Sequence, residues 1–287
     1  MILARQAAYT MLFVAFWMIV ELLGAHLQKT YSGYQIVWTR YVVHLAFMLA
    51  VWGRMRPLAL LHTRRPVFQM ARSLLMVVMP AAWLVSLSRG VAPQTMGACL
   101  LLTPLLVLLA ATIALGERPS RTNWSVAVVL AVAAGVFAML GDVPAMTLAF
   151  PLAVAVSLGL YIAMTRSLRD EGTLTNLFYT ALGVALVLTP LMPRIWVWPG
   201  LHDWLVLAAI GLAGFASLLA LDRATATAPA SSLGPVLGAL FAVSLLIDLL
   251  SVRLMAGGTA LAALSGALVI ACVLLWRRRQ AAVRRIA

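Results

Sequence analysis

The sequence predicts an all-α polytopic membrane protein with ten transmembrane helices, arranged as two inverted five-helix repeats. Three observations predict this fold: an excess of apolar residues, a series of uncharged runs of helical length, and matching residue spacings in the two halves. Of the 287 residues, 64% are apolar and 10% are charged, and the mean hydropathy is +1.02. A soluble domain has roughly 45–50% apolar and about 25% charged residues. No single soluble core buries this excess, so we expect an integral membrane protein.

The uncharged runs give the positions of the helices. A helix needs about 20 apolar residues to cross the hydrocarbon core. Strands of a membrane barrel are about half that length and alternate in polarity, so helices are favoured. A tenth span is expected at 33–53, where Arg40 interrupts an apolar stretch. The nine uncharged runs are 6–20, 73–88, 90–116, 122–141, 143–165, 172–193, 204–221, 224–247 and 254–276.

Short breaks between the runs contain residues typical of turns, such as Gly116-Glu117-Arg118-Pro119 and Trp198-Pro199-Gly200. The first run resembles a signal peptide, but it lacks a small-x-small cleavage site and its apolar character continues beyond residue 20. We therefore interpret it as the first span. Cys99 and Cys272 both lie in apolar runs, so no disulfide framework is predicted.

The basic residues predict the orientation. The net charge is +13, from 21 basic and 8 acidic residues, and 20 of the basic residues are Arg. In a soluble protein this excess would suggest nucleic-acid binding, but here it lies in the loops and predicts no nucleic-acid partner. With a cytoplasmic N-terminus, fifteen basic residues lie in inner segments and four, namely Lys29, Arg89, Arg194 and Arg253, lie in outer ones. The positive-inside rule thus predicts that both termini are cytoplasmic, in a bacterial inner membrane.

Two sets of residues share one spacing. Pro104, Glu117 and Gly135 lie 13 and 18 residues apart, and so do Pro235, Asp248 and Gly266. This register predicts a first repeat over 1–141 and a second over 142–287, the latter with a basic cytoplasmic tail. Five spans per repeat place the halves in opposite orientations, and inverted repeats are typical of secondary transporters.

Several short motifs also match a known family in order along the chain. Trp17 lies in the first span, Tyr161 in the sixth, and the others are Thr39-Arg40-Tyr41, Arg72-Ser73-Leu74-Leu75, Leu102-Thr103-Pro104-Leu105 and Leu115-Gly116-Glu117-Arg118. With ten spans, this set resembles the drug/metabolite transporter superfamily, of the type with two EamA domains. Ile247-Asp248-Leu249 stands where that family usually has a Gly-Glu pair. The resemblance implies transport of a small molecule by alternating access, with a cavity formed by spans one, three, four, six, eight and nine.

Three charged residues lie inside predicted spans, where each costs about 2.5–3.5 kcal/mol at the bilayer centre and is commonly functional. Glu21 and Arg40 lie at similar depth on consecutive helices. They form either a structural ion pair or a site for substrate charge or a proton. Arg72 either snorkels to the inner surface or heads a helical stripe with Met76 and Trp83 that lines a cavity.

Hydroxyl-bearing faces complete the candidate site. Thr103 shares a face with Thr95 and Cys99, and Ser157 shares one with Tyr161 and Thr165, which suits either a cavity wall or helix packing. Glu117 and Asp248 are expected to cap or bridge helix ends. No metal or cofactor is predicted. The predicted substrate-binding residues are Trp17, Glu21, Arg40, Arg72, Trp83, Thr103, Ser157 and Tyr161.

These features predict a secondary transporter, an exporter or exchanger, for a small metabolite such as an amino acid or a related zwitterion or anion. It would be a monomer or homodimer with a possible coupling proton. No ATP-binding loop is found, so uphill transport would use an ion or exchange gradient. The alternatives are proton-coupled efflux of cationic drugs or amines, and a membrane enzyme or assembly subunit. No enzyme is expected, because no nucleophile or metal cluster is present at one depth.

Overall fold

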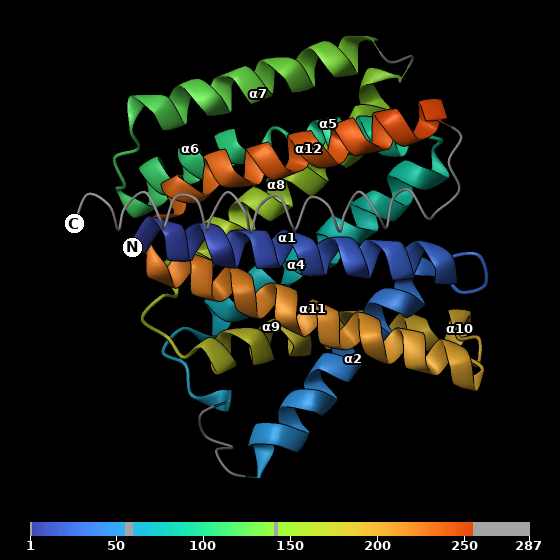
Figure 1. The fold of residues 1–287 in the computed structure, drawn as a ribbon. Coiled ribbons are helices and arrows are strands. Elements are labelled where there is room, and N and C mark those ends of the chain that lie inside the picture. Colours follow the sequence, from blue (N-terminus) through green and yellow to red (C-terminus); the bar gives the residue numbers. More distant parts are fainter. Residues whose placement is uncertain (1, 55–59, 141–142, 255–287) are drawn as a thin grey trace, which may run out of the picture.

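The computed structural model describes residues 2–54, 60–140 and 143–254, and every element in these ranges is helical (Figure 1). Eight helices in them are long and apolar enough to cross a membrane, and a shorter apolar helix covers Ala230–Leu246. The tenth predicted span, at 254–276, lies outside the described residues. The described chain therefore has the helical, polytopic character predicted from the sequence.

The elements of the first half are named here by their bounds. They are α1 (Ile2–Leu27), α2 (Gly33–Met48) with its π-helical continuation η1 (Leu49–Gly53), α4 (Pro66–Ser88), α5 (Pro93–Leu100), α6 (Thr103–Leu115) and α7 (Arg121–Leu140). Those of the second half are α8 (Ala145–Ser167), α9 (Thr173–Leu188), η2 (Thr189–Leu191), α10 (Met192–Ile195), α11 (Leu201–Thr227), η3 (Ala230–Ser232) and α12 (Leu233–Leu254).

Two boundaries differ from those predicted. The sequence placed a break between spans at Asp222-Arg223, but α11 continues through both residues to Thr227. Asp222 is 5% exposed inside the bundle, and a hydrogen bond from Asn176 to its carboxylate offsets part of the cost of burying it there. The fourth span is divided into α5 and α6 at Leu101-Leu102. Pro104 follows this break and has no backbone N–H to donate to the preceding turn.

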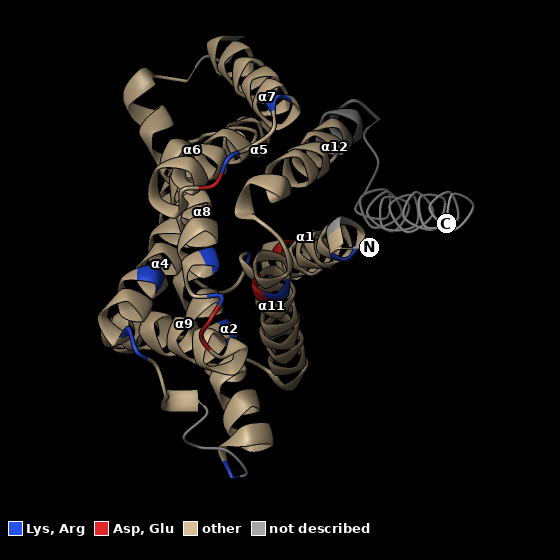
Figure 2. Ribbon diagram, turned by 90° about the vertical axis from the view of Figure 1, so that its left-hand side faces the viewer, with Lys and Arg blue, Asp and Glu red and all other residues tan. Residues whose placement is uncertain are grey.

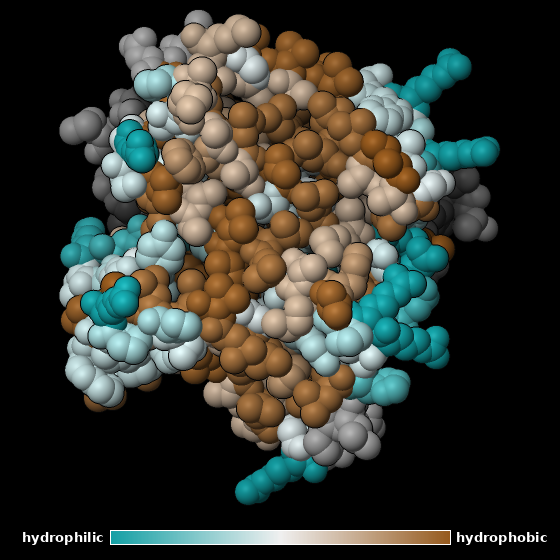
Figure 3. Space-filling view, turned by 180° about the vertical axis from the view of Figure 1, so that it is seen from behind, coloured by the Kyte–Doolittle hydropathy of each residue, from teal (hydrophilic) through white to brown (hydrophobic). Residues whose placement is uncertain are grey.

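The helices pack in a defined order. α1 packs on α11, α11 on α2, α2 on α9, α9 on α4, α4 on α8, and α8 on α6. α12 lies against α1, α5, α6 and α7, and α7 forms an outer layer (Figures 1 and 2). Apolar side chains spread across the middle of the surface and hydrophilic ones gather toward its two sides (Figure 3). This distribution suits a bundle whose mid-section faces lipid.

Interhelical hydrogen bonds define two ends of the bundle. At one end, Gln6 near the start of α1 bonds to Pro229 after α11. At the other end, Tyr31 after α1 donates to Asp203 at the start of α11 at 2.6 Å, and this bond raises the pKa of the Tyr31 phenol. We call the first the basic end, because Arg5, Arg118, Arg166 and Arg223 lie there near helix termini. Figure 2 views this end and shows basic segments on several helices. The other end, where Tyr31 bonds to Asp203, is called the cleft end after the cleft described below.

Candidate functional site

A cleft enters the bundle from the cleft end. Its walls come from the C-terminal halves of α1 and α4, the N-terminal half of α2, and single residues of α8 and α11. Four of the predicted site residues line it: Trp17, Glu21, Arg40 and Trp83. The sequence analysis therefore located half of its candidate residues in one cavity. Other lining residues are Val20, Gly24, Gln28, Gly33, Ile36, Val37, Tyr41, Met76, Met79, Pro80, Leu84, Val154 and Ile210.

The two charges of the cleft are not paired with each other. Among the described residues, no ion pair within 4.0 Å joins Glu21 to Arg40. Glu21 is exposed in the cleft. Arg40 is partly buried, its guanidinium lies 5.2 Å from the centre of the Tyr41 ring, and its Nε is buried without a hydrogen-bond partner. The two charges therefore form no direct ion pair, although Glu21 interacts electrostatically with Arg40 and accepts a hydrogen bond from Trp17, and both face the cleft.

The local packing explains how Arg40 is positioned. Gly214 of α11 faces it so closely that a Cβ atom there would collide with the Arg40 side chain, and one at Gly211 would collide with Val43. These two glycines let α11 approach α2 and leave room for the guanidinium beside the cleft. Small residues commonly allow such close helix approach in membranes.

Aromatic and thioether side chains form the rest of the wall. Trp17 packs edge-on against Phe13, with ring centres 5.3 Å apart. Met76, Met79 and Trp83 share one face of α4 and all three line the cleft, as their helical spacing predicted. Methionine side chains adapt to ligands of different shape. The cleft thus combines one acidic side chain, Glu21, and one basic side chain, Arg40, with an adaptable apolar wall.

Arg72 does not line the cleft. It lies one turn before Met76 and is 1% exposed, so in this structure it neither reaches the surface nor lines this cleft. Its Nη1 donates to Thr165 at 3.0 Å and to Tyr161 at 3.3 Å, and its Nη2 donates to the backbone oxygen of Asn176 at 2.6 Å. A guanidinium is retained at this depth because backbone and side-chain oxygens surround it.

The remaining three candidates are also buried away from the cleft. Tyr161 lies with its ring centre 5.0 Å from the Arg72 guanidinium and its hydroxyl 3.3 Å from that of Thr180. Ser157 is 3% exposed and Thr103 is fully buried, with no hydrogen-bond partner for its hydroxyl. In this structure these hydroxyl-bearing faces are therefore packed between helices and do not line the cleft.

A line of polar residues behind Arg72 was missed by the sequence analysis. Arg72 Nη2 donates to Gln69 Oε1 at 2.8 Å, Gln69 Nε2 donates to Asn176 Oδ1 at 2.6 Å, and Asn176 Nδ2 donates to Asp222 Oδ1 at 2.9 Å. We call these four residues the amide chain. Asp222 escaped notice because a charged pair, Asp222-Arg223, was interpreted as a loop. The signal available was the small-residue pattern of 224–228, which continues a helix well.

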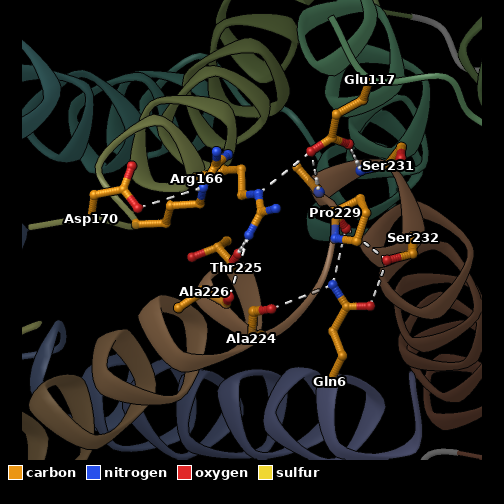
Figure 4. A network of polar contacts seen from close by, with 12 residues as sticks. Gln6, Glu117, Arg166, Asp170, Ala224, Thr225, Ala226, Pro229, Ser231 and Ser232 are labelled. Carbon is orange, nitrogen blue, oxygen red and sulfur yellow. Dashed lines mark hydrogen bonds and ion pairs between the residues drawn. The ribbon is translucent and has the colours of Figure 1, made fainter. Parts of the chain in front are cut away.

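A second network ties helix ends together at the basic end (Figure 4). The Glu117 carboxylate accepts hydrogen bonds from the backbone N–H groups of Ala230 and Ser231, both at 2.9 Å, and lies 3.5 Å from Arg166 Nε. The capping role predicted for Glu117 is thus confirmed. A carboxylate at this place is favourable because the first N–H groups of a helix have no partner within it.

The same network includes α1, α8 and α11. Arg166 Nη1 donates to the backbone oxygen of Thr225 at 2.6 Å, and Gln6 Nε2 donates to that of Pro229 at 3.0 Å. Ser232 donates to Gln6 Oε1 at 2.5 Å. Together with Glu117, these contacts join the ends of α1, α6, α8 and α11 to the start of η3 and α12 (Figure 4). The basic end is therefore cross-linked by polar contacts, whereas the other end holds the cleft.

Within residues 2–54, 60–140 and 143–254, no group of three or more His, Cys, Asp or Glu side chains is arranged to hold a metal ion. No family model matches the chain, and no curated protein matches it either. A solved structure described as "Crystal structure of protein" has a similar fold, with a TM-score of 0.62 and 20% identity over 93% of this chain and 98% of that chain. The likeness thus extends over nearly the whole helical bundle.

Proposed function

We propose that this protein is a secondary carrier for a small organic zwitterion or anion, such as an amino acid, and that it works by alternating access. The observation that carries the proposal is the cleft, which Glu21 and Arg40 both line without forming a direct ion pair, while the opposite end of the bundle is cross-linked. A carrier needs a site that is open to one side and sealed from the other. We further propose that the basic end is cytoplasmic, in a bacterial inner membrane, and that the protein exports or exchanges its solute.

The chemistry of the cleft favours a solute with opposite charges. An unpaired guanidinium beside apolar walls gains most from a carboxylate, because charge-assisted hydrogen bonds are about twice as strong as neutral ones. An ammonium group fits the Glu21 carboxylate in the same way. The adjacent wall of Trp17, Trp83 and the two methionines offers space for an apolar side chain. A zwitterion therefore satisfies both charges without leaving either one buried alone.

The packing of the two halves is consistent with an inverted repeat, which would support a carrier. α1 packs on α11 as α8 packs on α4, and α2 packs on α11 as α9 packs on α4. Near the start of α2, Gln35 donates to the backbone oxygen of Val197, in the segment before α11. Near the start of α9, Thr175 donates to that of His62, in the segment before α4. These pairs are what a two-fold relation between five-helix halves produces, and this is consistent with the EamA-type resemblance.

Efflux of a cationic amine is the second candidate function. It is favoured by the position of Glu21 on the same helix face as Trp17, opposite Trp83, because indole rings and a carboxylate together attract organic cations. Arg40 opposes it by repelling a cation. A solute that carries only positive charge therefore pairs with Glu21 and leaves Arg40 without an acidic partner.

The proposal is tested with purified protein in liposomes. We expect flux of labelled amino acids from a panel, competed by other zwitterions and less by amines or carboxylic acids alone. Glu21→Gln and Arg40→Gln should each weaken binding by about 10- to 100-fold, since a hydrogen bond to a charged group contributes about 1.5–3 kcal/mol. Arg89→Gln is the matched control, because Arg89 lies at the same end but outside the cleft, beside Phe150.

Absence of flux for every solute, with and without a pH gradient, would overturn the carrier proposal. Normal binding by both cleft variants would show that the cleft is not the substrate site. Amine flux that depends on Glu21 and not on Arg40 would establish the second candidate instead.

A further inference from the structure

We propose that Asp222 is a proton-binding site, and that its protonation breaks the link to Arg72 and favours opening of the basic end. Only the second part of this proposal, the change in which end of the bundle is open, rests on the proposed carrier function. The site itself follows from the contacts of the described residues. Asp222 is remote from Glu21, which lies in the cleft at the other end of the bundle.

Asp222 is a buried carboxylate without an ion-pair partner among the described residues. It is 5% exposed, and no Lys, Arg or His among the described residues lies within 4.0 Å of it. Its polar neighbours are the Asn176 amide and Thr173 at the start of α9. An ionised carboxylate in such surroundings is costly, and acidic residues placed in this way in membrane proteins commonly bind and release protons.

The hydrogen bonds of the amide chain all run in one direction. Each side chain donates toward Asp222: Arg72 to Gln69, Gln69 to Asn176, and Asn176 to the carboxylate. An ionised Asp222 accepts only, so it fixes the orientation of Asn176, and Asn176 fixes that of Gln69. The negative charge of Asp222 is thereby linked to the positive charge of Arg72 through two neutral amides, although the two charged groups do not touch.

Protonation changes this arrangement. A proton on the carboxylate removes the charge that balances Arg72 and turns one acceptor oxygen into a donor. When the Asn176 side-chain amide turns over to accept from that donor, the Asn176 NH₂ group faces Gln69. The Gln69 amide must then turn over as well, so that the Gln69 NH₂ group faces Arg72. The guanidinium then loses an acceptor while fully buried. Hydration of Arg72, by separation of α4, α9 and α11 at the basic end, relieves that cost.

The charged groups around Asp222 suit this role. Arg72 of α4 and Arg223 of α11 exert an electrostatic effect on it. Arg166 of α8 approaches the same end of α11, but it has Glu117 as its own acidic partner. The two residues of α9 that bond to it, Asn176 and Thr173, are neutral. Gln6 of α1, which bonds to Ala224 at the same end of α11, and Tyr161 and Thr165 of α8, which bond to Arg72, are neutral as well.

Infrared spectroscopy of the protein in lipid nanodiscs tests the site without any substrate. On acidification from pH ~9 to ~5, the range in which buried carboxyls titrate, we expect a C=O stretching band of a non-hydrated carboxylic acid. The Asp222→Asn variant should lack this band. Asp203→Asn is the matched control, because Asp203 is the other carboxylate of α11 and bonds to Tyr31, and Glu21→Gln is a second control. Both should retain the band. Its absence from the wild type, or its persistence in Asp222→Asn, would overturn the proposal.

Thiol labelling tests the opening. In a background with Cys99 and Cys272 replaced by Ala, Ala230→Cys reports access to the basic end, because Ala230 is fully buried beside Glu117. Ala226→Cys is exposed on α11 and corrects for the pH dependence of the thiol. The labelling ratio of the two should rise by up to about tenfold per pH unit on acidification, as expected for opening linked to one proton.

Two variants separate linkage from simple misfolding. With Asp222→Asn the labelling ratio should no longer depend on pH. With Gln69→Met, which interrupts the chain but leaves the carboxylate, the infrared band should remain while the pH dependence of labelling is lost. A ratio that still rises on acidification in either variant would contradict the proposed link. Loss of flux in liposomes with an intact pH response would refute the carrier function and leave the proton site standing.

Discussion

At the scale of single residues, burial separates the two arginines that the sequence analysis treated alike. Arg40 lies beside an open cleft, whereas Arg72 is enclosed and donates to four oxygen atoms, although the Nε of each is buried without a hydrogen-bond partner. The first is therefore suited to contact a ligand. The second holds α4, α8 and α9 together.

This difference predicts that replacing Arg72 destabilises the protein far more than replacing Arg40. Arg72→Met should lower the free energy of unfolding by about 3–5 kcal/mol, because it leaves the buried Gln69 Oε1 without its donor, removes a donor from Tyr161 and Thr165, and leaves Asp222 without a balancing charge. Arg40→Met should change it by less than about 1 kcal/mol, since no hydrogen bond is lost. Thermal unfolding of both variants in the same detergent measures the difference. Equal unfolding temperatures would show that the Arg72 contacts are not formed in the membrane-derived protein.

Residue types and helical spacing predicted part of the candidate site. Trp17, Glu21, Arg40 and Trp83 were located because charge and aromatic side chains recur on faces of α1, α2 and α4. Spacing along one helix does not show which neighbouring helix covers a face, so Arg72 and Tyr161 were placed in the cavity although α8 and α9 enclose them. Asp222 was missed because its partner, Asn176, is 46 residues away in the sequence.

At the scale of helices, close approach depends on a few glycines. Gly211 of α11 lies so near α2 that an added Cβ atom would contact Val43 and come within 3.2 Å of the Arg40 backbone oxygen. A backbone atom in this position does not move aside as a flexible side chain does. Gly135 of α7, in contrast, has no atom within 4 Å of the site of a Cβ.

Alanine at these two positions gives a matched pair. Gly211→Ala should destabilise the protein by about 1–3 kcal/mol through overpacking. Gly135→Ala should leave stability unchanged or raise it by up to about 1 kcal/mol, the difference in helix propensity. Unfolding temperatures in one detergent test both expectations. A neutral Gly211→Ala variant would mean that α11 and α2 are not held at this distance.

Most helices could be predicted from the sequence because uncharged runs of sufficient length have few alternatives in a bilayer. Their ends were less predictable. The break inside the fourth span depends on Pro104, and the continuation of α11 through Asp222-Arg223 depends on a tertiary contact. Pro104 can be read from the sequence. The contact between Asn176 and Asp222 exists only once α9 and α11 are packed together.

At the scale of the whole molecule, the two ends of the bundle differ in charge and in packing. The basic end carries Arg5, Arg118, Arg166 and Arg223, and the cross-linking network of Glu117 lies there. The positive-inside rule places such an end in the cytoplasm. The cleft would then open to the outside.

Labelling of single cysteines in intact cells tests this orientation. In a background without Cys99 and Cys272, Lys29→Cys at the cleft end should react with an impermeant maleimide. Asp170→Cys, an exposed position at the basic end, should react only after the cells are permeabilised. Both positions lie in turns between helices, so they serve as controls for each other. The reverse pattern would invert the proposed topology.

The break between α5 and α6 has a kinetic consequence. Pro104, which follows the break, rests against Gly234 of α12, whose Cβ position lies 3.4 Å from the Pro104 backbone oxygen, and Gly238 packs on the same ring. Because proline has already removed one backbone hydrogen bond, bending at this crossing breaks none. A movement of α6 over α12 would then have a low activation enthalpy, and its rate would change little on cooling. The carrier proposed above would then keep turning over in a cold membrane.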